Sequence, residues 1–159
     1  MRRRGSLFVF LAIAAVVALG FNTTFVAGLR SGAWPSDWYG QLIKPDWAPA
    51  LEVLATIWLA WYVVIAVAGW IVWRAQGLGL ALLLWFVQLG LNAAWPYVLF
   101  ERHRIDSAMD VIFALLFAIA GFIFVSWRLR KSASVLFGLY AGWIAYVAAF
   151  NLALLQSNT

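Results

Sequence analysis

The residues with the most chemistry to offer are tryptophans and amides that recur at helical spacing. The chain has 11 tryptophans in 159 residues. At about 100° per residue, Trp85, Gln88, Asn92 and Trp95 share one face of a helix. Indole rings stack on flat apolar molecules, and amides donate and accept hydrogen bonds. Such a face could enclose a flat, largely apolar ligand, or it could fill a solid core in which amides bond between helices.

Two other segments repeat this arrangement of aromatics on one face. The shared faces are formed by Trp58, Tyr62, Ile65 and Gly69 in one segment, and by Tyr140, Trp143, Val147 and Asn151 in the other. Small residues, which allow helices to approach closely, lie on the opposite sides of the segments that hold Asn92 and Tyr140. The predicted helix-packing positions are Gly90, Ala94, Gly138, Gly142, Ala145 and Ala149. Periodicity alone leaves the ligand pocket and the solid core equally open.

Few other residues offer catalytic or metal-binding chemistry. The chain has no cysteine, which excludes thiol catalysis and thiolate metal sites. The single histidine, His103, lies between Arg102 and Arg104, so we interpret it as a solvated side chain rather than a haem ligand. Asp110 is an acid about one turn inside an apolar segment, and it could face either the protein interior or water. We find no phosphate-binding loop or serine-nucleophile motif, and predict neither a metal site nor an obligatory cofactor.

The elements that position these residues are membrane-spanning helices. Of the chain, 66% is hydrophobic and 11% charged, which is too little polar surface for a soluble globule of this size. About 20 apolar residues cross a bilayer as a helix. The sequence predicts an all-α integral membrane protein, a single domain over 1–159 with a bundle of five helices at about 7–29, 51–73, 78–100, 107–127 and 133–155. The runs are apolar on every face, unlike the alternating strands of a β-barrel.

One connection, at about 30–49, is long and holds three of the four prolines. Loops of this length often bind ligands or act as lids. Because Trp34, Trp38, Tyr39 and Trp47 are atypical of a disordered tether, we predict an ordered lid.

The distribution of positive charge predicts the orientation. Seven cations fall on the side of the amino terminus, and four fall on the side of the long loop. The first set is Arg2, Arg3, Arg4, Arg74, Arg128, Arg130 and Lys131; the second is Arg30, Lys44, Arg102 and Arg104. Because Lys and Arg are retained in the cytoplasm, the amino terminus is expected inside, and the long loop and carboxyl terminus outside. The net charge of +5 indicates attraction to anionic membrane lipid, and no basic groove for nucleic acid is present. The basic start and apolar run also resemble a secretory signal, but the apolar run is longer than usual.

The segment 38–49, WYGQLIKPDWAP, resembles the first-loop signature of the TspO/MBR family, the tryptophan-rich sensory proteins related to the mitochondrial translocator protein. Trp58 with Tyr62 resembles the family's second-helix motif, and the segment 88–95, QLGLNAAW, its third-helix motif. Tyr140 and Trp143 with Asn151 resemble its fifth-helix motif. These matches follow one another in order over most of the chain.

The resemblance implies a five-helix bundle, commonly a homodimer, with a pocket beneath the first loop that binds tetrapyrroles such as porphyrin, haem or pigment precursors. It implies a receptor, sensor or transporter that regulates pigment metabolism. Carried over by position and joined to the aromatic faces above, the expected ligand-binding residues are Trp38, Tyr39, Trp58, Tyr62, Gln88, Asn92, Trp95, Tyr140 and Trp143.

Two other functions are retained. One is a light-dependent porphyrin-degrading enzyme with Trp58 and Trp143 as reactive tryptophans, and the other is a structural subunit of a larger membrane complex, such as a photosynthetic one. The chain also departs from the family pattern at Ala50 and Leu139, where prolines are usual. No Lys or Arg follows Tyr140, which removes the animal sterol motif, so cholesterol is not the expected ligand.

Overall fold

The computed structural model describes residues 8–16 and 36–159, and every regular element within them is helical. The elements after the helical segment at 8–16 are α2 (Ser36–Gln41), α3 (Leu51–Gln76), α4 (Leu80–Pro96), the π-helical turn η1 (Tyr97–Glu101), α5 (Ile105–Trp127) and α6 (Lys131–Asn158). The predicted all-α class is therefore confirmed.

Four stretches of the described residues are long and apolar enough to cross a membrane: Glu52–Gln76, Leu80–Glu101, Ile105–Trp127 and Lys131–Asn158. They match the last four predicted spans, with ends that differ by a few residues. The first predicted span, 7–29, falls mostly outside the described residues, of which 8–16 are helical. A bundle of five spanning helices thus stays a prediction, while a multi-pass membrane architecture is confirmed.

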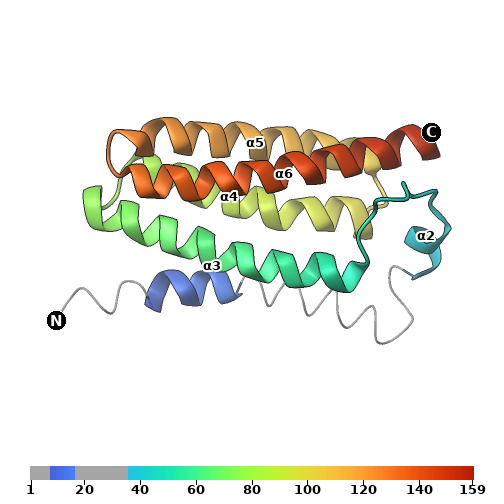
Figure 1. Cartoon of the computed structure of the whole chain (residues 1–159), viewed down its shortest axis with the longest axis horizontal. Coiled ribbons are helices and arrows are strands. Elements are labelled where there is room, and N and C mark those ends of the chain that lie inside the picture. The colour runs from blue at the N-terminus through green and yellow to red at the C-terminus, as the bar shows by residue number, and fades with distance from the viewer. Residues whose placement is uncertain (1–7, 17–35) are drawn as a thin grey trace.

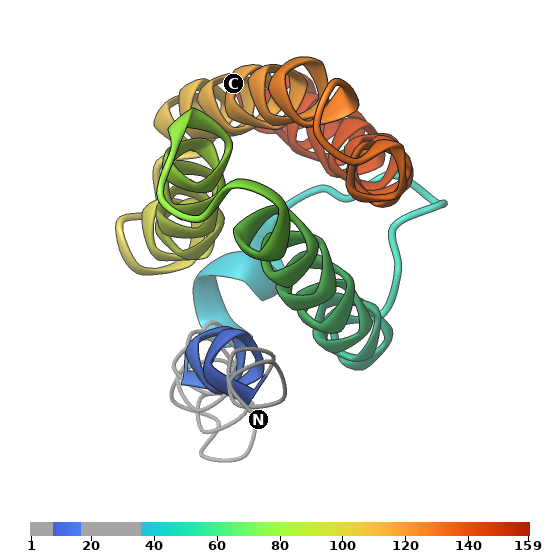
Figure 2. The same cartoon turned by 90° about the vertical axis from the view of Figure 1, so that its left-hand side faces the viewer.

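The long helices α3 to α6 lie side by side along the length of the molecule (Figure 1). Seen nearly end-on in Figure 2, they surround a common core, with α5 packed on both α4 and α6, and α3 against α6. The helical segment 8–16 lies outside this group, where the Phe10 ring is 5.1 Å from that of Trp85. α3 contacts α4 less extensively than it contacts α6, and the indoles of Trp58 and Trp85 bridge α3 and α4 through hydrogen bonds.

Short connections make neighbouring helices antiparallel. After α3 the chain reverses at Gly77, whose φ of 73° suits a residue without a side chain. The Gly77 N–H donates to the Trp73 carbonyl at 2.8 Å and closes the last turn of the helix. This reversal brings the aromatic faces of α3 and α4 toward each other.

Pro96 changes the course of the chain at the end of α4. Proline has no N–H to donate to the carbonyl four residues earlier, so regular α-helical bonding ends there. The chain continues as η1, a wider turn that Arg102 closes by donating its N–H to the Tyr97 carbonyl at 3.1 Å. Leu99 and Phe100 are fully buried by this turn. The predicted helix 78–100 is therefore not uniform, because it ends in a π-helical turn.

The described part of the long loop covers the end of the bundle at which α3 begins and α6 ends (Figure 1). Its backbone at Ile43 donates to Asn158 Oδ1 at 2.8 Å and accepts from Asn158 Nδ2 at 2.9 Å. Tyr39, in α2, packs edge-on against Phe100 at 5.3 Å. Residues 36–49 are thus held by aromatic and polar contacts, as the aromatic composition predicts, whereas Trp34 lies outside the described residues.

Candidate functional site

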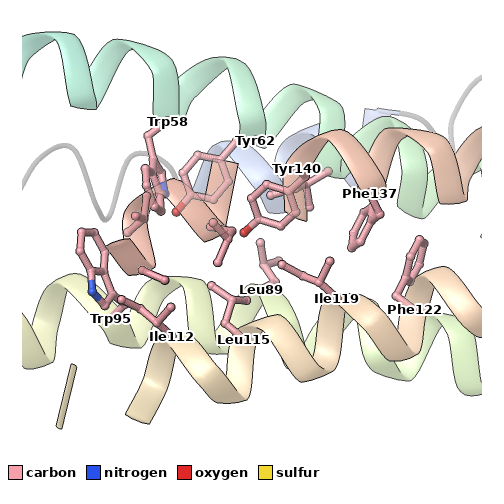
Figure 3. Close-up of a cluster of buried hydrophobic side chains, with 14 of the residues drawn as sticks. Trp58, Tyr62, Leu89, Trp95, Ile112, Leu115, Ile119, Phe122, Phe137 and Tyr140 are labelled. Carbon is pink, nitrogen blue, oxygen red and sulfur yellow. The ribbon is translucent and has the colours of Figure 1, made fainter. Parts of the chain in front are cut away.

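Asn92 is the centre of a buried polar cluster that joins three helices. Its Oδ1 accepts from Trp58 Nε1 at 2.9 Å and from the Tyr62 hydroxyl at 3.1 Å. Its Nδ2 donates to the Tyr140 hydroxyl. All four side chains are at most 2% exposed. Figure 3 shows Trp58, Tyr62 and Tyr140 reaching from α3 and α6 into the space between the helices. A single amide therefore organises three of the predicted site aromatics.

Tryptophan rings extend this cluster. Trp58 stacks on Trp95 with ring centroids 5.4 Å apart, and it meets Trp143 edge-on at 5.8 Å. Trp95 Nε1 donates to Asn151 Oδ1 at 3.3 Å, and Asn151 Nδ2 donates to the Ile105 carbonyl at 3.0 Å. The sequence placed Asn151 on the right face but not among the site residues, because periodicity does not show which indole an amide will bond.

Two buried polar atoms of the cluster have no hydrogen-bond partner in the described structure: Gln88 Oε1 and Trp143 Nε1. Gln88 lies one helical turn before Asn92 on the same face, and its Nε2 donates to the Trp85 carbonyl at 3.0 Å. Buried polar atoms without partners are uncommon and call for an explanation. The protein thus leaves one acceptor, on α4, and one donor, on α6, unsatisfied.

An aromatic column connects the cluster with the long loop. Trp143 is half-buried and stacks on Tyr146 at 5.3 Å, and the Tyr146 ring lies 5.6 Å from that of Trp47. The Tyr146 hydroxyl also donates to the Trp47 carbonyl at 3.4 Å. Tyr146 was not among the predicted site residues, although its position three residues after Trp143 on the same helix was the available signal.

The predicted site residues of the loop, Trp38 and Tyr39, do not touch Asn92 directly. Tyr39 reaches the cluster through Phe100, which lies 6.0 Å from Trp95. Burial, with a smaller effect of Tyr146, raises the pKa of Tyr39 to about 12. Lys44 places its ammonium 4.6 Å from the Tyr39 ring centre and donates to the Leu42 carbonyl at 3.1 Å. Tyr39 is therefore uncharged at neutral pH, and the Lys44 cation lies against its ring.

Two single residues of interest lie away from the cluster. His103 is exposed, as interpreted from the sequence, but it also stacks on Trp38 with centroids 4.5 Å apart. That contact was not predictable, because the two residues are far apart in the chain. Asp110 is exposed on α5, so it does not face the protein interior.

The predicted helix-packing stripes point outward. Gly90 and the α6 stripe are exposed, Ala94 is partly buried, and a Cβ added at Gly90, Gly138 or Gly142 would meet no atom within 4 Å. The α6 stripe is Gly138, Gly142, Ala145 and Ala149. The glycines at these positions lie away from the other described helices, and the role of the two stripes in helix packing stays a prediction.

The fold and the cluster together define a multi-pass helical membrane protein with a tryptophan and amide core beneath an aromatic loop. The chain belongs to the TspO/MBR family, whose model matches residues 10–156. It is 29% identical over 148 residues to the tryptophan-rich sensory protein of Cereibacter sphaeroides, covering 93% of this chain and 91% of the relative. It is 31% identical over 127 residues to the translocator protein of Ovis aries, with 76% and 75% covered. Protein CrtK of Rhodobacter capsulatus is 26% identical over 150 residues, with 87% and 92% covered.

Proposed function

We propose that this protein is a membrane sensor or receptor that binds a tetrapyrrole beside the Asn92 cluster. The observation that carries the proposal is the pair of buried atoms without partners, Gln88 Oε1 and Trp143 Nε1. Similar proteins are named as a sensory protein and a translocator protein, which favours recognition of a small molecule over a purely structural role.

The chemistry of the cluster suits a flat, largely apolar ring with polar edges. The half-buried indole of Trp143 would offer a stacking surface to such a ring once Tyr146, which now stacks on it, is displaced. The Gln88 oxygen can accept from a pyrrole N–H, and the Trp143 N–H can donate to a carboxylate or carbonyl at the ring edge. The ammonium of Lys44 is placed to attract a carboxylate that enters from the loop side.

A signal could leave the site through the aromatic column. Trp143, Tyr146 and Trp47 form a continuous series of ring contacts from the cluster to the loop. A ring inserted beside Trp143 would displace Tyr146 and, with it, the loop segment at Trp47. Ligand binding would then change the outer surface of the protein, which is what a sensor requires.

The test is a titration of the purified protein with protoporphyrin, followed by quenching of tryptophan fluorescence. We expect Trp143→Phe to weaken binding about tenfold, because the ring loses its hydrogen-bond donor and part of its stacking area. Gln88→Leu, which removes the free acceptor, should have a similar effect.

Trp127→Phe is the matched control for this titration, because Trp127 is 50% exposed at the opposite end of the bundle. Its affinity for protoporphyrin should equal that of the unchanged protein. Equal affinities in all variants would remove the proposed site, and weaker binding in the control alone would place the ligand elsewhere.

We also propose that the amino terminus is cytoplasmic, from the seven-to-four distribution of Lys and Arg. Ser36→Cys and Ser132→Cys provide the test, since the chain has no native thiol. In intact cells a membrane-impermeant maleimide should label Ser36→Cys and leave Ser132→Cys unlabelled until the membrane is opened. The reverse pattern would invert the orientation and place ligand entry on the cytoplasmic side.

A further inference from the structure

A small surface cavity lies at the end of the bundle opposite the long loop. Its volume is about 220 Å³, and it is lined by Trp70, Ile71, Arg74 and Arg130. Arg74 lies in the last turn of α3, with its guanidinium 5.1 Å from the centre of the Trp70 ring. Arg130 directly precedes α6, where its N–H donates to the Ser126 carbonyl at 2.7 Å. Two cations, one from the end of α3 and one from the connection between α5 and α6, therefore line one cavity.

These cations have no acidic partner nearby. Within the described residues the one ion pair joins Arg104 and Asp106, at the far end of the bundle. Every acid of the sequence belongs to the loop side: Asp37, Asp46, Glu52, Glu101, Asp106 and Asp110. Glu52 and Arg74 lie on one helix, at opposite ends, about 33 Å apart at 1.5 Å per residue. The positive charge at the cavity is thus not neutralised by the protein itself.

The cavity lies at the level where lipid head groups are expected. Trp70 is partly buried, and the neighbouring Trp73 and Trp127 are exposed near the ends of spanning helices. Exposed tryptophans in such positions favour the boundary between hydrocarbon and head groups. Arg128 and Lys131 lie on the same side and add to the attraction for anions.

We propose that the cavity between Arg74 and Arg130 binds the phosphodiester of an anionic membrane lipid such as phosphatidylglycerol. Guanidinium groups bind phosphate oxygens through paired, charge-assisted hydrogen bonds, and two of them can hold one phosphate from both sides. The indole of Trp70 keeps the Arg74 side chain over the cavity. The acyl chains would extend along the apolar surface of α3.

The experiment titrates the full-length protein in a neutral detergent with phosphatidylglycerol and counts the bound lipid by native mass spectrometry. We expect one tightly bound phosphatidylglycerol. Arg74→Gln and Arg130→Gln should each weaken it roughly tenfold or more, since each removes a charge-assisted contact. Arg74→Lys should lose less, because it keeps the charge without the planar fork. Circular dichroism of each variant verifies the fold.

The matched control is the double variant Arg128→Gln/Lys131→Gln, which removes charge from the same end without altering the cavity lining. It should retain the tightly bound lipid. If this control lost phosphatidylglycerol as strongly as the Arg74 and Arg130 variants, binding would depend only on the total positive charge at this end, and the proposal would be overturned. Equal binding of phosphatidylcholine would overturn the requirement for an anionic lipid. Binding of inorganic phosphate that displaces the lipid at equal concentration would assign the cavity to free anions instead.

Discussion

Replacing Asn92 by leucine should destabilise this protein more than any other single change in the aromatic cluster. The Asn92 side chain forms hydrogen bonds with Trp58, Tyr62 and Tyr140. Leucine has a similar size but can form none of these hydrogen bonds. A buried polar group left without a partner costs about 1–3 kcal/mol, although amides in membrane bundles often contribute less. We expect a loss of about 2–5 kcal/mol in the free energy of unfolding for Asn92→Leu. This free energy can be measured by unfolding the protein in mild detergent that contains increasing fractions of dodecyl sulfate.

Gln156→Leu is the control for this experiment, because it makes a similar change at an exposed position of α6. Its unfolding midpoint should match that of the unchanged protein. If Asn92→Leu were equally stable, the three hydrogen bonds would contribute nothing to the fold, and Asn92 would be free to serve the ligand alone. A stable Asn92→Leu that binds no protoporphyrin would make that distinction directly.

Gly69→Ala should produce the second large effect, through overpacking. A Cβ at this position would lie 2.5 Å from Trp85 Nε1 and 2.6 Å from its Cε2. The indole would have to move, and its hydrogen bond to the Ile65 carbonyl, 2.8 Å long, would be lost. Overpacking typically costs about 1–3 kcal/mol, and the lost bond adds about 1 kcal/mol. The same unfolding series should show a clear fall in the midpoint.

The control for Gly69→Ala is Gly90→Ala, because a Cβ at Gly90 would meet no atom within 4 Å. Alanine in a helix interior is more favourable than glycine by about 0.5–1 kcal/mol, so this control should be as stable as the unchanged protein or slightly more. Rescue provides a second check. Gly69→Ala should cost less when combined with Trp85→Phe, which removes the indole atoms that clash. An equal cost in both backgrounds would contradict the packing explanation.

Gly69 also shows how the fold uses a missing side chain. The sequence placed it on the aromatic face of its helix, where its purpose was not apparent. In the structure the Trp85 ring of α4 packs directly against the backbone of α3 at Gly69. The indole N–H can therefore donate to the Ile65 carbonyl, one turn earlier on α3. Phe10 packs edge-on against the same ring, with the ring centroids 5.1 Å apart. A glycine thus determines the position of the deepest tryptophan of α4.

The sequence by itself determined the class of the protein and the inner faces of three long helices, α3, α4 and α6. Apolar runs of sufficient length specify spanning helices, since a backbone in lipid must satisfy its own hydrogen bonds. The period of 3.6 residues correctly placed Trp58, Asn92 and Tyr140 on inner faces, whereas the small residues of α6, which were predicted to pack against another helix, are exposed. The class of the protein and the inner face of a helix both depend on which residue types follow one another along the chain. The sequence alone therefore predicts them.

Only the tertiary structure decided which side chains meet. Periodicity does not determine the rotation and depth of one helix against another, so the choice of Asn92 rather than Gln88 as the centre of the cluster was not predictable. The π-helical turn after Pro96 brings Phe100 beneath Tyr39, and the end of α6 beyond the predicted limit brings Asn158 to Ile43. Arg74 and Arg130, which line one cavity, are likewise 56 positions apart, from 74 to 130. Such contacts depend on the packing of whole helices, which no local pattern records.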